Sequence, residues 1–173
     1  NTKVIVITGP AGSGKSTLIK DLLENITKKW YYGVIFTNKI HMNNFYNFFN
    51  PLWIYKRYSP LLYDRCFHSQ MFIILDNYQG NISEIVKNIE DKNILLIIAS
   101  EKIITSNNLD YIFITGKNNI ENNKIIYNLI CDNINYSLSF IQFNEIIEEY
   151  TKDFYILVIN CKTDNLNNLF LNY

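Results

Sequence analysis

The sequence predicts an α/β protein of three layers, in which a mostly parallel central sheet of about five or six strands lies between helices. Two observations carry this prediction. Short runs of β-branched and aliphatic residues alternate along the 173-residue chain with stretches whose apolar residues recur at helical spacing. A glycine-rich segment, residues 9–16, joins the first apolar run to the first helical stretch, as in the βαβ unit of a parallel sheet.

The first half of the chain contains the best-defined elements. Residues 3–8 are a β-branched run that predicts a buried strand, and residues 33–37 predict a second one. Between them, residues 16–29 carry a helical stripe of apolar side chains, Leu18, Ile19, Leu22, Leu23 and Ile26. Residues 38–70 are rich in asparagine and aromatic residues and contain two of the three prolines. We expect short helices and loops there, packed on the sheet through their aromatic rings.

The second half of the chain continues the alternation of strands and helices. Strands are predicted at residues 71–75, 94–99, 111–115 and 154–160. Apolar residues at helical spacing predict helices around residues 82–89, 125–130 and 143–150. We expect residues 1–160 to form one domain and the polar residues 161–173 to be a poorly ordered tail.

Composition narrows the class of protein. Hydrophobic residues make up 48% and charged residues 18%, which is typical of a globular domain. The 16 basic and 16 acidic residues cancel, so a surface for nucleic acid has to be local. The aliphatic runs are shorter than the roughly 18 residues that would span a bilayer, and we expect no signal peptide. Three widely spaced cysteines fit a reducing compartment, so we expect a cytoplasmic protein that is not secreted and has no membrane partner.

The segment from residue 9 to residue 16 reads GPAGSGKS and matches the P-loop pattern of a nucleotide-binding protein, with a strand before it and a helix after it. Its glycines let backbone N–H groups wrap around a phosphate. The charge of Lys15 is expected on the β- and γ-phosphates, and the hydroxyl of Ser16 on Mg²⁺. The motif predicts ATP and Mg²⁺ as ligands, with the choice between ATP and GTP left open. The expected nucleotide-binding residues are Gly9, Pro10, Ala11, Gly12, Ser13, Gly14, Lys15, Ser16 and Thr17.

Polar residues at the ends of two later strands are the other candidate site residues. Asp76 ends an apolar strand and is expected to hold Mg²⁺ through water, from the strand next to that of the P-loop. Asn77 follows it, and an amide can orient a water molecule but cannot accept its proton. Ser100 is a candidate sensor of the γ-phosphate, and Glu101 a candidate displaced acid. The predicted catalytic set is Lys15, Asp76, Asn77 and Ser100.

The order of these elements resembles the viral genome-packaging ATPases of the FtsK–HerA superfamily, found in poxviruses, other large DNA viruses and virophages. The P-loop and the strands ending at Asp76 and Ser100 carry the resemblance, and residues 143–155 resemble the closing helix and strand of that family. The resemblance implies a homo-oligomeric ring that hydrolyses ATP to translocate viral double-stranded DNA into a capsid. Double-stranded DNA and a capsid protein are then the implied partners, and the host cytoplasm or a viral factory the implied location.

Departures from the family pattern keep other functions open. Asn77 stands where the family has an acid, and Ser100 where it has glutamine. The region of its arginine finger offers only Lys87 and Lys92. A hydrolytically impaired nucleotide-binding module is therefore one alternative. A nucleoside or nucleotide kinase is another, because residues 64–65 (Asp-Arg) resemble the acceptor segment of thymidylate kinases, and a viral superfamily 3 helicase, whose P-loop also begins with Gly-Pro, is a third.

Overall fold

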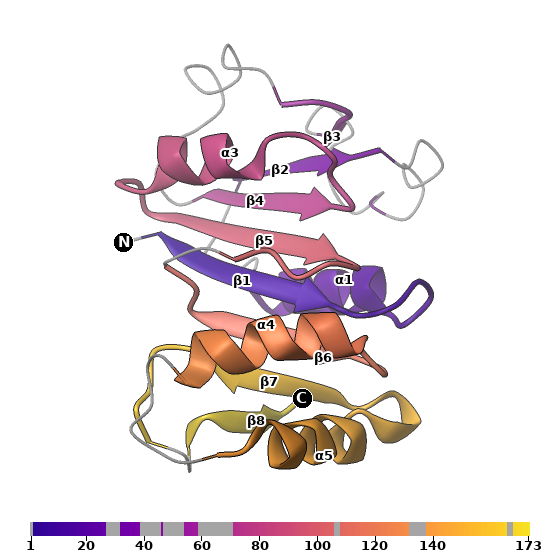
Figure 1. Ribbon diagram of the computed structural model, residues 1–173. Helices are drawn as coiled ribbons and strands as arrows, with labels where there is room; N and C mark the ends of the chain where they lie inside the picture. The colour runs from indigo at the N-terminus through magenta and orange to yellow at the C-terminus, as the bar shows by residue number, and fades with distance from the viewer. Residues whose placement is uncertain are drawn as a thin grey trace. The chain divides into compact units, whose positions relative to one another are not determined.

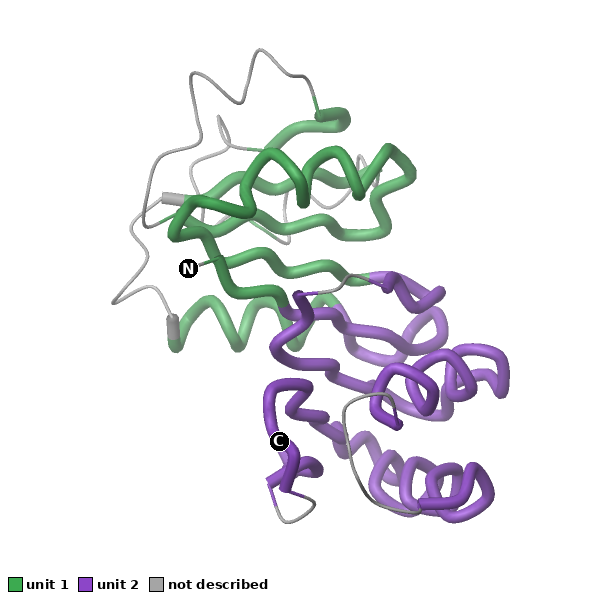
Figure 2. The backbone as a smooth tube through the Cα atoms, turned by 60° about the vertical axis from the view of Figure 1, so that its left-hand side comes forward, with its two compact units in different colours: residues 1–4, 16–99 green, residues 5–15, 100–173 purple. Residues whose placement is uncertain are grey.

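In the computed structural model of the chain, the residues that the structure describes form an α/β fold, with eight strands in a mostly parallel, mixed sheet and four α-helices. The structure describes residues 2–26, 32–38, 46, 54–58, 71–105, 108–131, 138–165 and 168–173. The chain divides into two compact units, the first of residues 1–4 and 16–99 and the second of residues 5–15 and 100–173 (Figure 2).

The first unit contains a parallel four-stranded part of the sheet in the order β3-β2-β4-β5 (Figure 1). Its strands are β2 (Tyr32–Thr37), β3 (Ile54–Tyr55), β4 (Met71–Asp76) and β5 (Ile94–Ser100). All six residues of β4 are buried, as expected for a strand that pairs on both edges. The register aligns Thr37, Asp76 and Ala99, so the carboxyl ends of three strands meet at one edge.

Two helices belong to this unit. Helix α1 (Lys15–Ile26) follows the glycine-rich loop and buries the predicted apolar stripe at Leu18, Ile19, Leu22 and Leu23. Helix α3 (Ile82–Ile89) begins after Asn81, whose side chain accepts a hydrogen bond from the backbone N–H of Glu84. This cap fixes the start of the helix immediately after the segment that follows β4.

The second unit contains strands in the order β1-β6-β7-β8. They are β1 (Lys3–Thr8), most of which belongs to this unit, β6 (Tyr111–Thr115), β7 (Ile156–Asn160) and β8 (Phe170–Asn172). Strands β1 and β6 are parallel, whereas β7 is antiparallel to both β6 and β8. The register pairs Thr8 with Ile114, so the P-loop leaves β1 beside the carboxyl end of β6.

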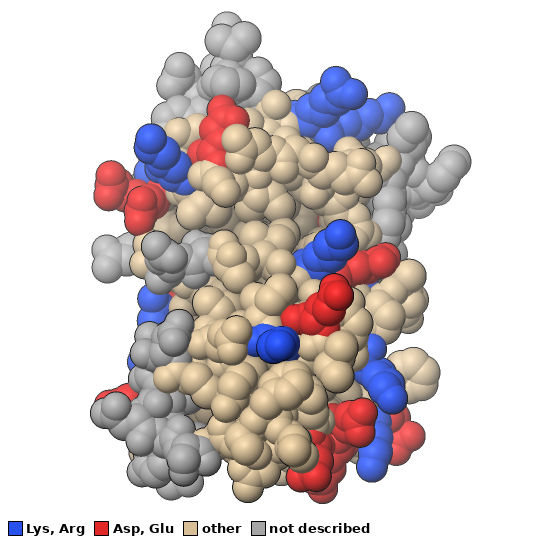
Figure 3. Space-filling view, in the orientation of Figure 1, with Lys and Arg blue, Asp and Glu red and all other residues tan. Residues whose placement is uncertain are grey.

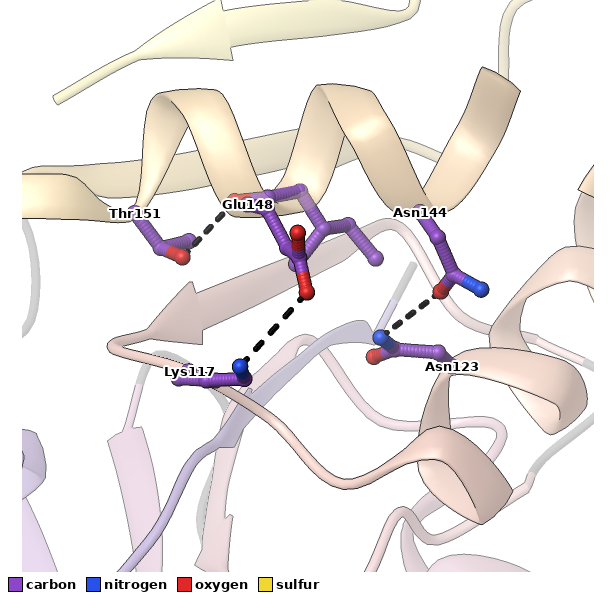
Figure 4. Close-up of polar contacts among 6 residues, drawn as sticks. Lys117, Asn123, Asn144, Glu148 and Thr151 are labelled. Carbon is purple, nitrogen blue, oxygen red and sulfur yellow. Dashed lines mark hydrogen bonds and ion pairs between the residues drawn. The ribbon is translucent and has the colours of Figure 1, made fainter. Parts of the chain in front are cut away.

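Helices α4 (Ile120–Cys131) and α5 (Phe140–Tyr150) complete this unit, and the short 3-10 helix η3 (Lys152–Phe154) follows α5. A capping box between Ser139 and Gln142 begins α5. Asn123 of α4 donates a 3.0 Å hydrogen bond to Asn144 of α5 (Figure 4). The exposed pair of Lys117 and Glu148, 3.6 Å apart, lies next to this contact in the same view and adds little stability because water screens it.

The predicted α/β fold with a mostly parallel sheet is confirmed and the six predicted strands are present, while β3 and β8 add two short strands to the expected five or six. Two and three residues are too few to show a periodic pattern. Strand β8 also overturns the expected low order of residues 161–173, since it pairs with β7 and Tyr173 packs edge-on against Phe113. Residues 1–160 as one domain, and 161–173 as a separate tail, stay a prediction.

Most of residues 38–70 lie outside the described residues, so the predicted helices and loops there stay a prediction. Its described residues do pack through aromatic rings. The ring of Phe36 lies 6.0 Å from that of Tyr55 and 5.9 Å from that of Tyr58, and it also contacts Tyr78. In the described part of the chain, no helix is long and apolar enough to cross a bilayer. On the face drawn in Figure 3, basic and acidic side chains are interspersed.

Candidate nucleotide-binding site

The loop between β1 and α1 has the backbone of a phosphate-binding loop. Gly12 and Gly14 have φ angles of 75° and 89°, a conformation that side chains disfavour. Gly9 is buried, and a Cβ atom there would collide with the carbonyl oxygen and the hydroxyl of Thr115. Pro10, Ala11, Gly12, Gly14 and Thr17 are exposed, and Ser13 and Ser16 are half-buried. Glycine therefore permits the backbone conformation at positions 12 and 14 and the close packing against Thr115 at position 9.

The side chain of Lys15 folds back over the same loop. Its ammonium donates hydrogen bonds of 2.7 Å to the carbonyl oxygen of Gly9 and 2.6 Å to that of Pro10. The residue is only 6% exposed, so its charge lies in a surrounding of low polarity, where electrostatic attraction to a phosphate is strong. These two carbonyls hold the ammonium at the loop.

A chain of hydroxyl groups ties the loop to β6. The hydroxyl of Thr115 donates to the carbonyl oxygen of Thr8, at 3.2 Å. Since it has one proton, its 2.7 Å contact with Ser13 is a hydrogen bond that Ser13 donates. Thr115 thus links the end of β1, the loop and β6. Thr115 was not among the predicted site residues, although a polar residue followed by Gly116 at the end of an apolar strand is a usable signal.

In the first unit, three side chains meet at the end of β4. The carboxylate of Asp76 is fully buried. Its Oδ2 atom accepts a 3.0 Å hydrogen bond from the hydroxyl of Tyr46 and lies 3.5 Å from that of Ser16. Its Oδ1 atom is also buried and has no hydrogen-bond partner among the described residues. Asp76 therefore has one oxygen in hydrogen bonds and one in need of a partner.

The phenol of Tyr46 is a permanent donor to Asp76. Burial raises the pKa of Tyr46 far above its usual value, and the charge of Asp76 and the hydrogen bond between them raise it further. The phenol is therefore protonated at neutral pH and can donate its proton to the hydrogen bond. No motif in the sequence distinguishes Tyr46 from the other aromatic residues around it.

The residues at the end of β4 fit Mg²⁺. A buried carboxylate oxygen without a partner is costly, and a cation or its water would supply one. Carboxylate and hydroxyl oxygens are ligands that Mg²⁺ accepts, and it usually keeps several waters and takes phosphate oxygens as well. Among the described residues there is no group of three His, Cys, Asp or Glu side chains that would hold a metal alone. Asp76 and Ser16 suit a cation that arrives with a nucleotide.

Strand β4 does not have the neighbour that we expected. It pairs with β2 on one edge and with β5 on the other, so the expectation that Asp76 ends the strand next to that of the P-loop is wrong. Sequence order alone does not reveal a crossover, because consecutive strands need not be neighbours in a parallel sheet.

Asn77 directly follows β4 in a left-handed conformation, with a φ angle of 48°. Its backbone N–H donates a 2.8 Å hydrogen bond to the carbonyl oxygen of Ala99, which fixes the turn. Asparagine adopts this conformation more readily than glutamate does. Its expected role in orienting a water molecule stays a prediction.

Ser100 and Glu101 lie at the end of β5, in the second unit. The hydroxyl of Ser100 accepts a 3.2 Å hydrogen bond from the backbone N–H of Lys102, a contact of a strand-end turn. Glu101 is exposed, and its carbonyl oxygen accepts a hydrogen bond from Asn122. The sensor role of Ser100 and the acid role of Glu101 stay predictions. The segment that resembles kinases, residues 64–65, lies outside the described residues.

Comparison with known proteins identifies similar sequences and folds. Residues 3–46 match the nucleotide-binding domain of the CobW/HypB/UreG family. The chain is 28% identical over 146 residues to uncharacterized protein 015R of Frog virus 3 (isolate Goorha), a match that covers 69% of this chain and 45% of that protein. The chain thus spans less than half the length of this relative.

Solved structures of the genome packaging NTPase B204 from Sulfolobus turreted icosahedral virus 2 have a similar fold. The complex with ATP-gammaS has a TM-score of 0.65 at 14% identity, over 99% of this chain and 96% of that one. The complexes with sulfate and with AMPPCP have TM-scores of 0.59 and 0.57, at 13% and 15% identity and with the same coverage. The chain therefore carries a nucleotide-binding P-loop domain whose fold is similar to that of a viral packaging NTPase.

Proposed function

We propose that this chain is the ATPase domain of a DNA-packaging motor of the FtsK–HerA superfamily, which hydrolyses ATP to translocate viral double-stranded DNA into a capsid. The observation that carries the proposal is a P-loop with a buried strand-end aspartate, in a fold similar to a genome packaging NTPase over almost the whole chain. The viral origin of the relative in Frog virus 3 supports the same assignment.

Nucleotide binding follows from the loop. Residues 9–17 would bind the phosphates through backbone N–H groups, and Lys15 would neutralise charge on the β- and γ-phosphates. Ser16 and Asp76 would hold Mg²⁺, with waters and phosphate oxygens as its further ligands. When bound, Mg²⁺ supplies positive charge against the charge that develops during phosphoryl transfer.

Hydrolysis would depend on less usual residues. Asn77 would orient the attacking water by hydrogen bonds, and Ser100 would contact the γ-phosphate. Because an amide does not accept a proton, we expect turnover to be slow. A homo-oligomeric ring, double-stranded DNA and a capsid protein are the proposed partners, in the host cytoplasm or a viral factory. Translocation is proposed for the whole protein, and the chain spans less than half the length of its relative in Frog virus 3.

One observation favours a second candidate, a nucleotide-binding module with impaired hydrolysis. Asn77 is held in a left-handed turn that an asparagine tolerates better than the usual acid. An amide in this turn cannot act as a general base, whereas the residues proposed to bind nucleotide would not be affected by it.

Release of phosphate from ATP–Mg²⁺, measured with and without double-stranded DNA at concentrations that permit assembly, tests the proposal. DNA-stimulated release that is lost in Lys15→Ala supports the motor. A clear thermal shift with ATP–Mg²⁺ and no release of phosphate under any condition supports the impaired module. Absence of both signals contradicts nucleotide binding itself.

A further inference from the structure

We propose that Tyr46 is a positioning residue of the cation site, whose hydroxyl turns the carboxylate of Asp76 so that its Oδ1 atom faces Mg²⁺ or a water bound to it. The inference rests on the proposed function, since it concerns the cation that accompanies the nucleotide. Tyr46 lies 30 residues before Asp76 in the sequence and belongs to none of the motifs identified above.

The two oxygens of Asp76 have different surroundings. Oδ2 accepts from Tyr46 at 3.0 Å, and its contact with Ser16 is longer, at 3.5 Å. Oδ1 is buried and has no hydrogen-bond partner among the described residues. The hydrogen bond from Tyr46 is the better of the two by distance, so it decides which oxygen is left for the cation.

A carboxylate needs such a restraint. The terminal torsion of aspartate is broad, so the group exchanges its oxygens unless a neighbour holds one of them. A donor to a charged acceptor is a strong restraint, and Tyr46 is fully buried, so water does not compete for it.

The hydroxyl of Ser16 is the second group that points to the carboxylate of Asp76. When its single hydroxyl proton points to Oδ2, its lone pairs point away from the carboxylate and are available to a cation. Tyr46 and Ser16 then both donate to Oδ2. The oxygen of Ser16 and, directly or through a water, Oδ1 of Asp76 would then hold the cation, and Tyr46 would be an outer residue that orients one of these ligands.

A purely structural role for Tyr46 makes a different prediction. As a buried aromatic residue it needs a hydrogen-bond partner for its hydroxyl, and any acceptor would serve. Removing the hydroxyl would then lower the unfolding temperature and leave the cation dependence of nucleotide binding unchanged. Dependence on Mg²⁺ is therefore the readout that separates the two roles.

The test compares Tyr46→Phe with Tyr58→Phe. Tyr58 is a matched control in the same unit, because its hydroxyl accepts a 2.7 Å hydrogen bond from Asn88 of α3. Fluorescent ATP is titrated with Mg²⁺ and with EDTA, and Mn²⁺ binding in the presence of ATP is followed by electron paramagnetic resonance. For Tyr46→Phe we expect the half-saturating Mg²⁺ and Mn²⁺ concentrations to rise about tenfold, with ATP affinity in EDTA unchanged. Tyr58→Phe should leave both quantities as in the unchanged protein.

A fallback measurement covers an unstable variant, and two outcomes would contradict the proposals. If Tyr46→Phe is unstable, the extra rise in unfolding temperature that Mg²⁺ gives over ATP alone can still be titrated, and Tyr46→Phe added to Asp76→Asn should shift it no further. Equal Mg²⁺ dependence of Tyr46→Phe and the unchanged protein would overturn the positioning role while leaving ATP binding intact. If the unchanged protein shows no Mg²⁺-dependent ATP binding, the proposed function itself fails.

Discussion

The hydroxyl of Ser13 donates a 2.7 Å hydrogen bond to that of Thr115, a residue 102 positions later in the sequence. The hydroxyl of Thr115 in turn donates a hydrogen bond to the carbonyl oxygen of Thr8, at the end of β1. The shape of the phosphate-binding loop is therefore held from outside the motif, by the last residue of β6. A pre-shaped loop loses less entropy on binding, so we expect this contact to affect ATP affinity as well as stability.

We expect Thr115→Val, which keeps the shape of the side chain and removes its hydroxyl, to weaken ATP binding about fivefold, the equivalent of about one hydrogen bond. The matched control is Thr151→Val, which removes a buried 2.7 Å hydrogen bond to the carbonyl oxygen of Ile147 at the end of α5 (Figure 4). Both variants should lose about 1 kcal/mol of unfolding free energy. Isothermal titration with ATP should distinguish them, and equal affinities would show that Thr115 does not shape the loop.

Removal of the ammonium in Lys15→Ala should abolish the thermal shift with ATP–Mg²⁺, because the charge that its two carbonyl contacts hold at the loop is lost. Lys20→Ala is the control in the same helix, since Lys20 lies in an exposed pair with Glu24 and contributes little to stability. Differential scanning fluorimetry with and without ATP–Mg²⁺ measures both. An unchanged shift in Lys15→Ala would contradict the P-loop assignment.

Asn77→Glu should raise the rate of ATP hydrolysis about tenfold or more, because it supplies the general base that the amide lacks. The same change should lower stability by about 1–2 kcal/mol, since the residue has a φ angle of 48°. Asn77→Gly is the control, because glycine accepts the left-handed conformation and has no side chain to act on water. Phosphate release and thermal unfolding are measured on both. No gain in rate for Asn77→Glu would mean that the site lacks more than its acid.

The free energy of unfolding should depend on pH through the thiol of Cys161. Burial, opposed by Lys162 and aided by Asp110, raises the pKa of Cys161 from 9.0 to about 11. A raised pKa contributes stability that is fully present below pH 9 and is lost as the pH rises to about 11. We expect the unfolding free energy to fall over this window, and to fall less in Cys161→Ala, with denaturant titrations at each pH as the measurement. The same slope in both proteins would assign the loss to other groups.

The fold was largely predictable because its strands are buried on both faces and so appear as uninterrupted apolar runs, of which β4 is an example. The loop was predictable because phosphate binding needs glycine at fixed positions, such as Gly12 and Gly14. Strand β8 could not be predicted, because three residues are too few to show a periodic pattern. The position of β4 between β2 and β5 could not be predicted either, because it depends on long-range packing.

The side chains that complete the site were harder to predict than the motif. Tyr46 acts at Asp76 through a contact between distant positions, and no spacing rule connects them. The contact between Thr115 and Ser13 likewise joins positions that are far apart in the sequence. Outer residues of this kind are set by the folded geometry, whereas motif residues are set by the ligand, and only the latter leave a local pattern.

The division of the chain into two units has a consequence for work with fragments. The chain leaves the first unit after Val4, returns to it at Ser16 and leaves it again after Ala99, so neither unit is a continuous stretch of polypeptide. One of these crossings is the peptide bond between Lys15 and Ser16, the proposed phosphate and cation residues. No single proteolytic cut or truncation can release one unit whole, and a split-protein reporter cut near residue 99 would divide the strand β1 and the P-loop from residues that belong with them.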